Sequence, residues 1–214
     1  VRKLASDRGI VLIFDECTSG FRQTFGGLHR YHKVNPDIAI FGKALGNGHA
    51  INAIIGRKDV MEFCNSTFIS STFWTERIGP TAALATIEVM EKIKSWKIIV
   101  KKGELIKKKW KKISKSNGVD IDIKGLSSIP NFIFKYKNNL AYKTFITQEM
   151  LKKKILASNV IYCSIYHDKN LLEKYFDILN GLFSQISKFE KNNIDTNKIL
   201  ETNICLSGLR DKKI

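Results

Sequence analysis

The sequence predicts an α/β protein with a mostly parallel sheet in residues 1–100, followed by a small α+β domain in residues 101–214. Two continuous apolar runs, "IVLIFDE" (10–16) and "DIAIF" (37–41), lie in the first part. Such runs are typical of parallel strands that helices cover on both faces. The second part has two runs that alternate apolar and polar residues, "VDIDIKG" (119–125) and "NFIFKYK" (131–137). Alternation indicates an antiparallel sheet with one exposed face, so we place the domain boundary near residue 100.

The remaining elements of the first domain follow from local signals. Residues 2–8 are expected to end a helix that Gly9 closes, and "INAIIG" (51–56) is expected to be a third strand of the same buried kind. A long helix should start near Pro80, because proline suits the first turn of a helix. We expect that helix to break around Ser95 or Gly103.

The second domain should contain two further helices and a third strand. "TQEMLKKKILAS" (147–158) reads as a helix with Thr147 as its N-cap, since a threonine oxygen can accept from free N–H groups there. "VIYCSIY" (160–166) reads as a strand, and residues 170–192 have the periodicity of an amphipathic helix.

Composition limits the class of protein. The four cysteines, Cys17, Cys64, Cys163 and Cys205, are widely spaced, so we expect free thiols in a cytoplasmic protein and predict no metal site. No apolar run approaches the roughly 18 residues that a membrane helix needs, so no membrane partner is expected. The chain starts without Met directly before a strand, and we expect it to be cut from something longer.

The net charge of +16 raises the question of an acidic partner. The densest basic block, "KKGELIKKKWKKISK" (101–115), keeps its apolar residues at helical spacing, which indicates an amphipathic helix with a solvated lysine face. Aromatic residues do not alternate with basic ones as they do in RNA-binding strands. We therefore predict no nucleic-acid partner, and a non-catalytic basic fragment that binds acidic partners remains an alternative.

An acid and a lysine are expected to meet at the ends of the first two strands. Asp15 ends one strand, Lys43 follows the next, and ligands of α/β sheets collect at the carboxyl ends of strands. Pyridoxal phosphate chemistry needs this pair, because a lysine amine forms a Schiff base with the cofactor aldehyde and an aspartate keeps the ring nitrogen protonated. Taken singly, an aspartate at a strand end is usually a cap, and a lysine in a glycine-rich loop is usually a surface residue.

The run "IVLIFDE" also fits the second motif of a P-loop ATPase, in which an aspartate holds Mg²⁺ and a glutamate polarises water. The phosphate-binding motif G-x-x-x-x-G-K-[ST] should then lie upstream. It is not found in this sequence, and "FGKA" fails because Ala44 is not serine or threonine. A P-loop ATPase fragment thus remains an alternative only if that motif lies elsewhere.

Three ordered motifs carry a resemblance to a known family, and they are "LIFDECTSGFR" (12–22), "VNPDIAIFGKALGNGHAINAIIGRKDVM" (34–61) and "SSTFWTERIGPTAALATIEVM" (70–90). Together they resemble the class III pyridoxal-phosphate-dependent aminotransferases, nearest to the glutamate-1-semialdehyde 2,1-aminomutase branch. "IYHDKNLLEKYFDIL" and the closing "CLSGLRDKK" resemble the C-terminal domain of that branch. The resemblance implies a fold-type I transferase, pyridoxal 5'-phosphate as cofactor, an amino donor and a carbonyl acceptor as substrates, and a homodimer.

The same resemblance assigns roles to four residues. Lys43 would be the catalytic Schiff-base lysine, and Asp15 would pair with the pyridine nitrogen of the cofactor. Cys17 stands where the family usually has a branched aliphatic residue on the ring face. Thr72 matches the threonine that binds the cofactor phosphate from the other subunit of the dimer.

Two departures from the family pattern bear on activity. The family often has Gly-Gly-Asn-Pro after the phosphate-binding threonine, but this chain has "FWTER" (73–77), in which Trp74 and Arg77 would change the entrance of the active site. The family's phosphate loop and ring-stacking aromatic residue lie upstream of the aspartate motif, and nothing here matches them. The resemblance therefore implies the C-terminal portion of an aminotransferase, with an aminomutase as the alternative activity.

Overall fold

A computed structural model describes residues 1–207, apart from the side chain of Asn197. The chain divides into two compact units, Val1–Ile99 and Val100–Ile214, and each is described by itself. Most of the closing "CLSGLRDKK" motif, from residue 208 onward, lies outside the described residues. No helix within residues 1–207 combines the length and the apolar character that crossing a membrane requires.

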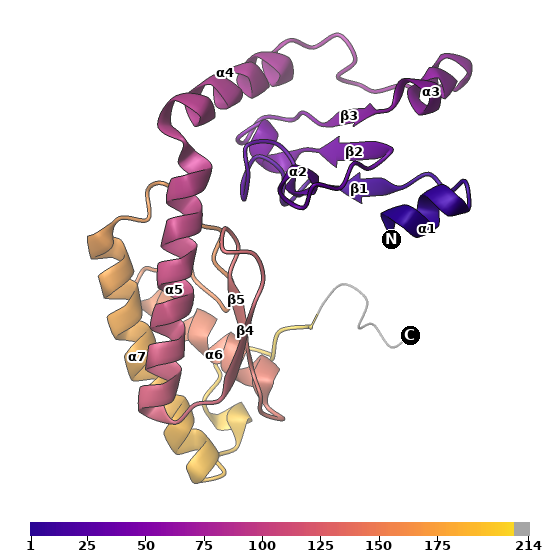
Figure 1. Cartoon of the computed structure of the whole chain (residues 1–214). Coiled ribbons are helices and arrows are strands. Elements are labelled where there is room, and N and C mark those ends of the chain that lie inside the picture. The colour runs from indigo at the N-terminus through magenta and orange to yellow at the C-terminus, as the bar shows by residue number, and fades with distance from the viewer. Residues whose placement is uncertain (208–214) are drawn as a thin grey trace. The chain divides into compact units, whose positions relative to one another are not determined.

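The first unit is built on a three-stranded sheet in the order β1 (Ile13–Asp15), β2 (Ile38–Phe41) and β3 (Ala53–Gly56) (Figure 1). The two predicted apolar strands pair in parallel, with Asp15 opposite Ile40. The third strand differs from the expectation, because it pairs antiparallel to β2. The connection from β2 to β3, residues 42–52, contains η1 (Lys43–Leu45) and reverses the chain, whereas a parallel strand would need a crossover of a dozen or more residues.

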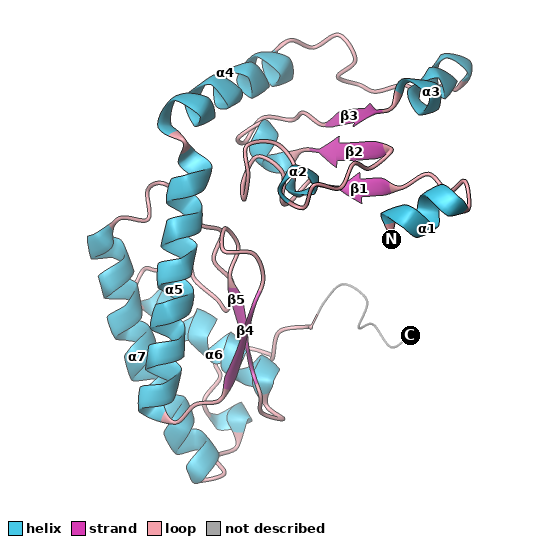
Figure 2. Ribbon diagram, in the orientation of Figure 1, coloured by secondary structure: helices cyan, strands magenta, loops and turns pink. Residues whose placement is uncertain are grey.

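Short helices and one long helix surround this sheet: α1 (Arg2–Asp7), α2 (Leu28–Tyr31), η1 (Lys43–Leu45), α3 (Lys58–Met61), η2 (Glu62–Ser66) and α4 (Ile78–Ile93) (Figure 2). The core of the unit is small, and its buried members are Ala39 and Phe41 of β2, Leu45 of η1 and Ala83 of α4. This cluster ties α4 to the turn that directly follows β2.

The predicted long helix breaks at one of the two expected places. Lys94 has a left-handed backbone (φ 53°) and separates α4 from α5 (Ser95–Asn117). Gly103 does not break the helix. It lies inside α5, where the missing Cβ allows the backbone carbonyl of Ser127 to pack directly against the helix.

The second unit combines a two-stranded antiparallel sheet, β4 (Ile121–Lys124) and β5 (Asn131–Phe134), with helices α6 (Asn139–Lys152), α7 (Lys169–Lys191) and η3 (Thr196–Lys198). Helices α5 and α7 lie side by side (Figure 2), and the buried indole N–H of Trp110 donates to the hydroxyl of Tyr175 at 3.0 Å. Aromatic rings of β5, α6 and α7 pack on Trp110 and on one another, namely Phe132, Phe134, Tyr142 and Phe183.

Two expectations for the second unit were wrong. Helix α6 begins at Asn139, so Thr147 lies inside it and its hydroxyl donates to the carbonyl of Lys143. Burial of the earlier turns against the core decides where the helix starts, and this outweighs the capping preference of threonine. Residues 160–166 form no strand apart from a single bridge at Val160, because their N–H groups reach the carbonyls of Pro130 and Ser128 without completing a ladder.

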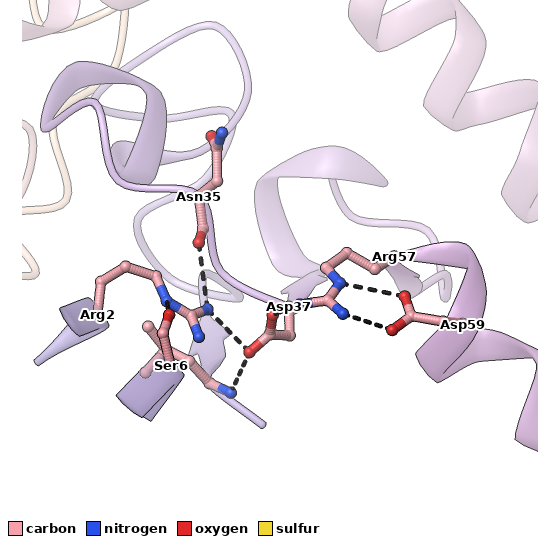
Figure 3. Close-up of polar contacts among 7 residues, drawn as sticks. Arg2, Ser6, Asn35, Asp37, Arg57 and Asp59 are labelled. Atoms are coloured by element: carbon pink, nitrogen blue, oxygen red, sulfur yellow. Dashed lines mark hydrogen bonds and ion pairs between the residues drawn. The ribbon is translucent and has the colours of Figure 1, made fainter. Parts of the chain in front are cut away.

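A carboxylate cluster fastens the amino-terminal end of the first sheet (Figure 3). The side chain of Asp37 is 4% exposed and accepts hydrogen bonds from the Leu12 N–H (2.7 Å), Arg2 Nη1 (2.8 Å) and Arg57 Nη1 (2.8 Å). These donors favour the ionised form and lower the pKa of Asp37 to about 2. Asp37 thus links α1, the start of β1 and the end of β3 at the edge of the sheet opposite to Lys43.

Candidate functional site

The carboxyl ends of β1 and β2 bring an acid and a lysine to one edge of the sheet. Asp15 is the last residue of β1, and Lys43 begins the turn η1 two residues after β2 ends. Because these strands are parallel neighbours, both ends lie on the same side. Both side chains are exposed, and Lys43 Nζ donates to the hydroxyl oxygen of Thr18 at 2.5 Å, so the amine reaches the loop that follows Asp15.

Cys17 lies beside this pair. Its N–H donates to Asp15 Oδ1 at 3.0 Å, which fixes the orientation of the carboxylate. Burial, a hydrogen bond from the thiol to Asp15 and the charge of Asp15 raise the pKa of the thiol, and the nearby Lys43 opposes this shift only in part. Asp15 and Cys17, which are close in sequence, therefore form one cluster with Lys43, which is far from both in the chain.

The backbone around Lys43 is unusual. Lys43 has a φ of 46°, in the left-handed region that residues with a Cβ avoid. The preceding Gly42 has no Cβ, and one placed there would lie 3.4 Å from the Cys17 sulfur and would overlap the side-chain amide of Asn52. Backbone strained in this way persists only where the surrounding structure holds it in place.

The neighbouring acid, Glu16, has a different role from Asp15. Successive residues of a strand point to opposite faces, and Glu16 is buried. Burial raises the pKa of Glu16, but hydrogen bonds from the Ser19 hydroxyl (2.5 Å) and from the backbone N–H groups of Leu28 and His29 outweigh it and hold the pKa below its usual range. Through these hydrogen bonds Glu16 stabilises the loop that precedes α2. This arrangement disfavours the ATPase alternative, in which Glu16 would have to reach water.

A cleft of about 610 Å³ opens beside Lys43. Its polar lining residues include Lys43, His49, Asn52, Ser71 and Glu76, and its apolar ones include Ile51, Phe73, Trp74 and Pro80. Thr72 is exposed and does not itself line the cleft, whereas its neighbours Ser71 and Phe73 do. Asn52 and Phe73 were not predicted as site residues, since nothing in their local sequence pattern sets them apart.

Comparison with known proteins identifies relatives of this chain. The model of the family "Aminotransferase class-III" matches residues 1–159. The chain is 32% identical over 178 residues to a 3-aminobutyryl-CoA aminotransferase of Cloacimonas acidaminovorans (strain Evry), a match that covers 83% of this chain and 42% of the relative. It is also 32% identical over 201 residues to a glutamate-1-semialdehyde 2,1-aminomutase of Methanosphaera stadtmanae, covering 92% of this chain and 43% of that protein.

Solved structures show the same fold. The FumI protein of Sphingopyxis sp. MTA144 superposes with a TM-score of 0.82 at 17% identity, over 93% of this chain and 49% of that one. An omega-transaminase from Sphaerobacter thermophilus superposes with a TM-score of 0.76 at 19% identity, over 87% of this chain and 47% of that one. The chain therefore spans less than half the length of each of these four proteins.

Proposed function

This chain belongs to the class III aminotransferase family, and we propose that it forms the cofactor-binding part of a pyridoxal-phosphate-dependent aminotransferase. In this proposal, residues 1–100 are the C-terminal part of the large cofactor domain and residues 101–214 are the small C-terminal domain. The juxtaposition of Asp15 and Lys43 at the carboxyl ends of two parallel strands carries the proposal.

The residues at this edge fit pyridoxal phosphate chemically. The cofactor has a ring nitrogen that needs a carboxylate partner and an aldehyde that needs an amine, and Asp15 and Lys43 offer these groups on the same side of the sheet. Gly42 has no Cβ, and this leaves room for the side chains of Cys17 and Asn52 to lie close to the backbone at this point. When bound, the cofactor supplies an electron-accepting ring that weakens the bonds of the substrate carbon carrying the amino group.

Four residues of this chain, Asp15, Cys17, Thr18 and Lys43, would then act on the cofactor or position one another. Asp15 would keep a proton on the ring nitrogen, and the N–H of Cys17 would hold the Asp15 carboxylate in place for this. Lys43 would bind the cofactor covalently through Nζ and, once released, would take a proton from the substrate carbon and return it to a neighbouring atom. The hydroxyl of Thr18 would position the Lys43 amine between these tasks.

We extend the proposal to assembly and location. Thr72 would donate its hydroxyl to the cofactor phosphate of a second subunit in a homodimer, and its exposed position beside the cleft supports this role. The four cysteines, all within the described residues, form no disulfide bond, which supports a reducing compartment and hence the cytoplasm.

Borohydride reduction of the intact protein with pyridoxal phosphate tests the proposal. Reduction makes the bond between cofactor and lysine permanent, and we expect peptide mapping to find the label on Lys43. Lys43→Ala should lose the label, whereas Lys58→Ala, which removes another exposed lysine of the first unit, should keep it. A label on any lysine other than Lys43 would refute the assignment.

The choice between aminotransferase and aminomutase needs a separate experiment, since relatives with both names are equally similar to the chain. An aminotransferase leaves its amino group on the protein-bound cofactor until a second carbonyl substrate arrives, whereas an aminomutase returns it to the same molecule. We expect turnover to stop when the carbonyl acceptor is left out. Turnover of a single amino substrate without an acceptor would establish the aminomutase instead.

A further inference from the structure

The buried carboxylate of Glu16 is bonded to the loop that contacts the candidate reactive lysine. Glu16 is 3% exposed, which is rare for a glutamate. Its Oε2 accepts from the Ser19 hydroxyl at 2.5 Å, and its Oε1 accepts from the His29 N–H at 2.9 Å. Ser19 is the neighbour in sequence of Thr18, whose hydroxyl meets the amine of Lys43. The carboxylate therefore holds the residue next to this contact.

The backbone of Glu16 fixes the same loop from its other end. The Glu16 N–H donates to the carbonyl of Ile40 in β2 at 2.8 Å, and the Glu16 carbonyl accepts from the Gly20 N–H at 2.8 Å. Residues 16–20 thus form one closed turn that is attached to β2. A Cβ at Gly20 would lie 2.6 Å from the ring of Phe41, so the turn packs on the last residue of β2 as closely as glycine allows.

Thr18 lies in the middle of this turn and has both of its oxygens in use. Its hydroxyl oxygen accepts from Lys43 Nζ at 2.5 Å, and its carbonyl accepts from Arg22 Nε at 3.1 Å. The backbone of Lys43 starts from the end of β2, on which the turn is packed. The distance between the Thr18 hydroxyl and the amine therefore depends on the shape of the turn, which the bonds of Glu16 set.

An ionised carboxylate is well suited to fix a turn in this way. Hydrogen bonds to a charged acceptor are roughly twice as strong as those between neutral groups, and burial keeps water from competing for them. Burial alone would raise the pKa of Glu16, but the hydrogen bonds from Ser19, Leu28 and His29 hold it below its usual range. The carboxylate therefore stays ionised at neutral pH.

We propose that Glu16 is a positioning residue for the reactive amine and acts through Ser19 and Thr18. The hydrogen bond between Glu16 and Ser19 sets the place of the Thr18 hydroxyl, and this hydroxyl holds Lys43 Nζ at the carboxyl end of the sheet. The two consecutive acids then serve one site, Asp15 towards the cofactor ring and Glu16 towards the amine. The inference rests on the proposed function, because the position of this amine matters only if it reacts.

Competitive acetylation of the intact protein, prepared without pyridoxal phosphate, tests the inference. Mass spectrometry gives the acetylation of Lys43 by acetic anhydride relative to that of Lys58, an exposed lysine of the same unit. An amine that donates a hydrogen bond reacts more slowly, because the bond has to break first. We expect Ser19→Ala to raise the ratio of Lys43 to Lys58 acetylation by about threefold to tenfold, the value of one hydrogen bond. Ser19→Thr keeps the hydroxyl and should leave the ratio unchanged.

A double-mutant cycle separates positioning from a merely structural role. Thr18→Val removes the hydroxyl that Lys43 contacts, and it should raise the ratio at least as much as Ser19→Ala does. Adding Ser19→Ala to Thr18→Val should change the ratio no further, since Ser19 acts through Thr18. Ser66→Ala is the matched control, because it removes another hydroxyl hydrogen bond of the first unit, and it should leave the ratio unchanged.

The outcomes separate this inference from the proposed function. An unchanged ratio in Ser19→Ala, or the same increase with and without the Thr18 hydroxyl, would overturn the inference even if borohydride labels Lys43. If Ser19→Ala does not fold, Glu16→Gln, which keeps the size of the side chain and loses the charge, must raise the ratio, and an unchanged ratio there would overturn the inference equally. If the ratio rises as expected while borohydride fails to label Lys43, the proposed function falls and Glu16 still positions the amine.

Discussion

The left-handed backbone of Lys43 gives a test of the site that does not need the cofactor. With a φ of 46°, a residue with a Cβ is strained at this position by roughly 1–2 kcal/mol relative to glycine. Glycine loses roughly 0.4–1 kcal/mol through the greater freedom of its unfolded chain. Lys43→Gly should therefore leave the first unit more stable than Lys43→Ala by about 1 kcal/mol, although both lose the amine.

Native-state hydrogen exchange followed by mass spectrometry measures this difference in stability within the first unit, Val1–Ile99. Peptides that cover β2 (Ile38–Phe41) report the opening of the sheet, and about 1 kcal/mol corresponds to about fivefold slower exchange in Lys43→Gly than in Lys43→Ala. Lys58 is the control, because it is an exposed lysine at the start of helix α3. At that position alanine should be at least as stable as glycine.

Glycine is thus expected to be more stabilising than alanine at position 43, and no more stabilising than alanine at position 58. If Lys43→Ala were as stable as Lys43→Gly, or if both sites gave the same order, Lys43 would not occupy a left-handed backbone. The surrounding structure would then not hold a strained lysine at the carboxyl end of the sheet.

Three further outcomes are expected from other parts of the molecule. Asp37 has its pKa lowered to about 2, below the roughly 3.9 of an unfolded aspartate. Its stabilisation of the first unit should therefore be complete above about pH 4 and lost as the pH falls to about 2, and Asp37→Asn should remove this acid dependence from β2 exchange. Cys17 has a raised pKa, so its alkylation by iodoacetamide should be slow at neutral pH and still accelerate above pH 9.0; a rate that levels off below pH 8 would contradict the contact with Asp15. Gly103→Ala should destabilise the second unit by about 1–3 kcal/mol in urea unfolding, because its Cβ would overlap the Ser127 carbonyl, whereas Gly181→Ala in α7, where nothing lies within 4 Å of the added carbon, should stabilise it by about 0.5–1 kcal/mol.

The sequence by itself determined the features that depend on local patterns. The runs ending at Asp15 and preceding Lys43 are continuous in apolar residues, and this pattern predicted two parallel strands with charged residues at their ends. The parallel pairing is confirmed, whereas the expected burial of the first run is not, because Ile13 of β1 is 51% exposed. The periodicity of residues 170–192 likewise marked α7, because one apolar face must be buried. The motifs around these strands also led to the correct family.

Only the tertiary structure decided how the side chains converge. It left Asp15 exposed and buried Glu16, it placed Lys43 in a left-handed turn, and it brought Phe73 and Trp74 to the wall of the cleft beside that lysine. These features depend on close contacts between residues that are not neighbours in sequence. Examples are the contact of Gly79 with the carbonyl of Ala50 and the contact of Gly42 with the side chain of Asn52. A hydrophobic pattern determines which residues are buried, but which residues meet across the fold depends on turn geometry and on close contacts between segments far apart in the chain.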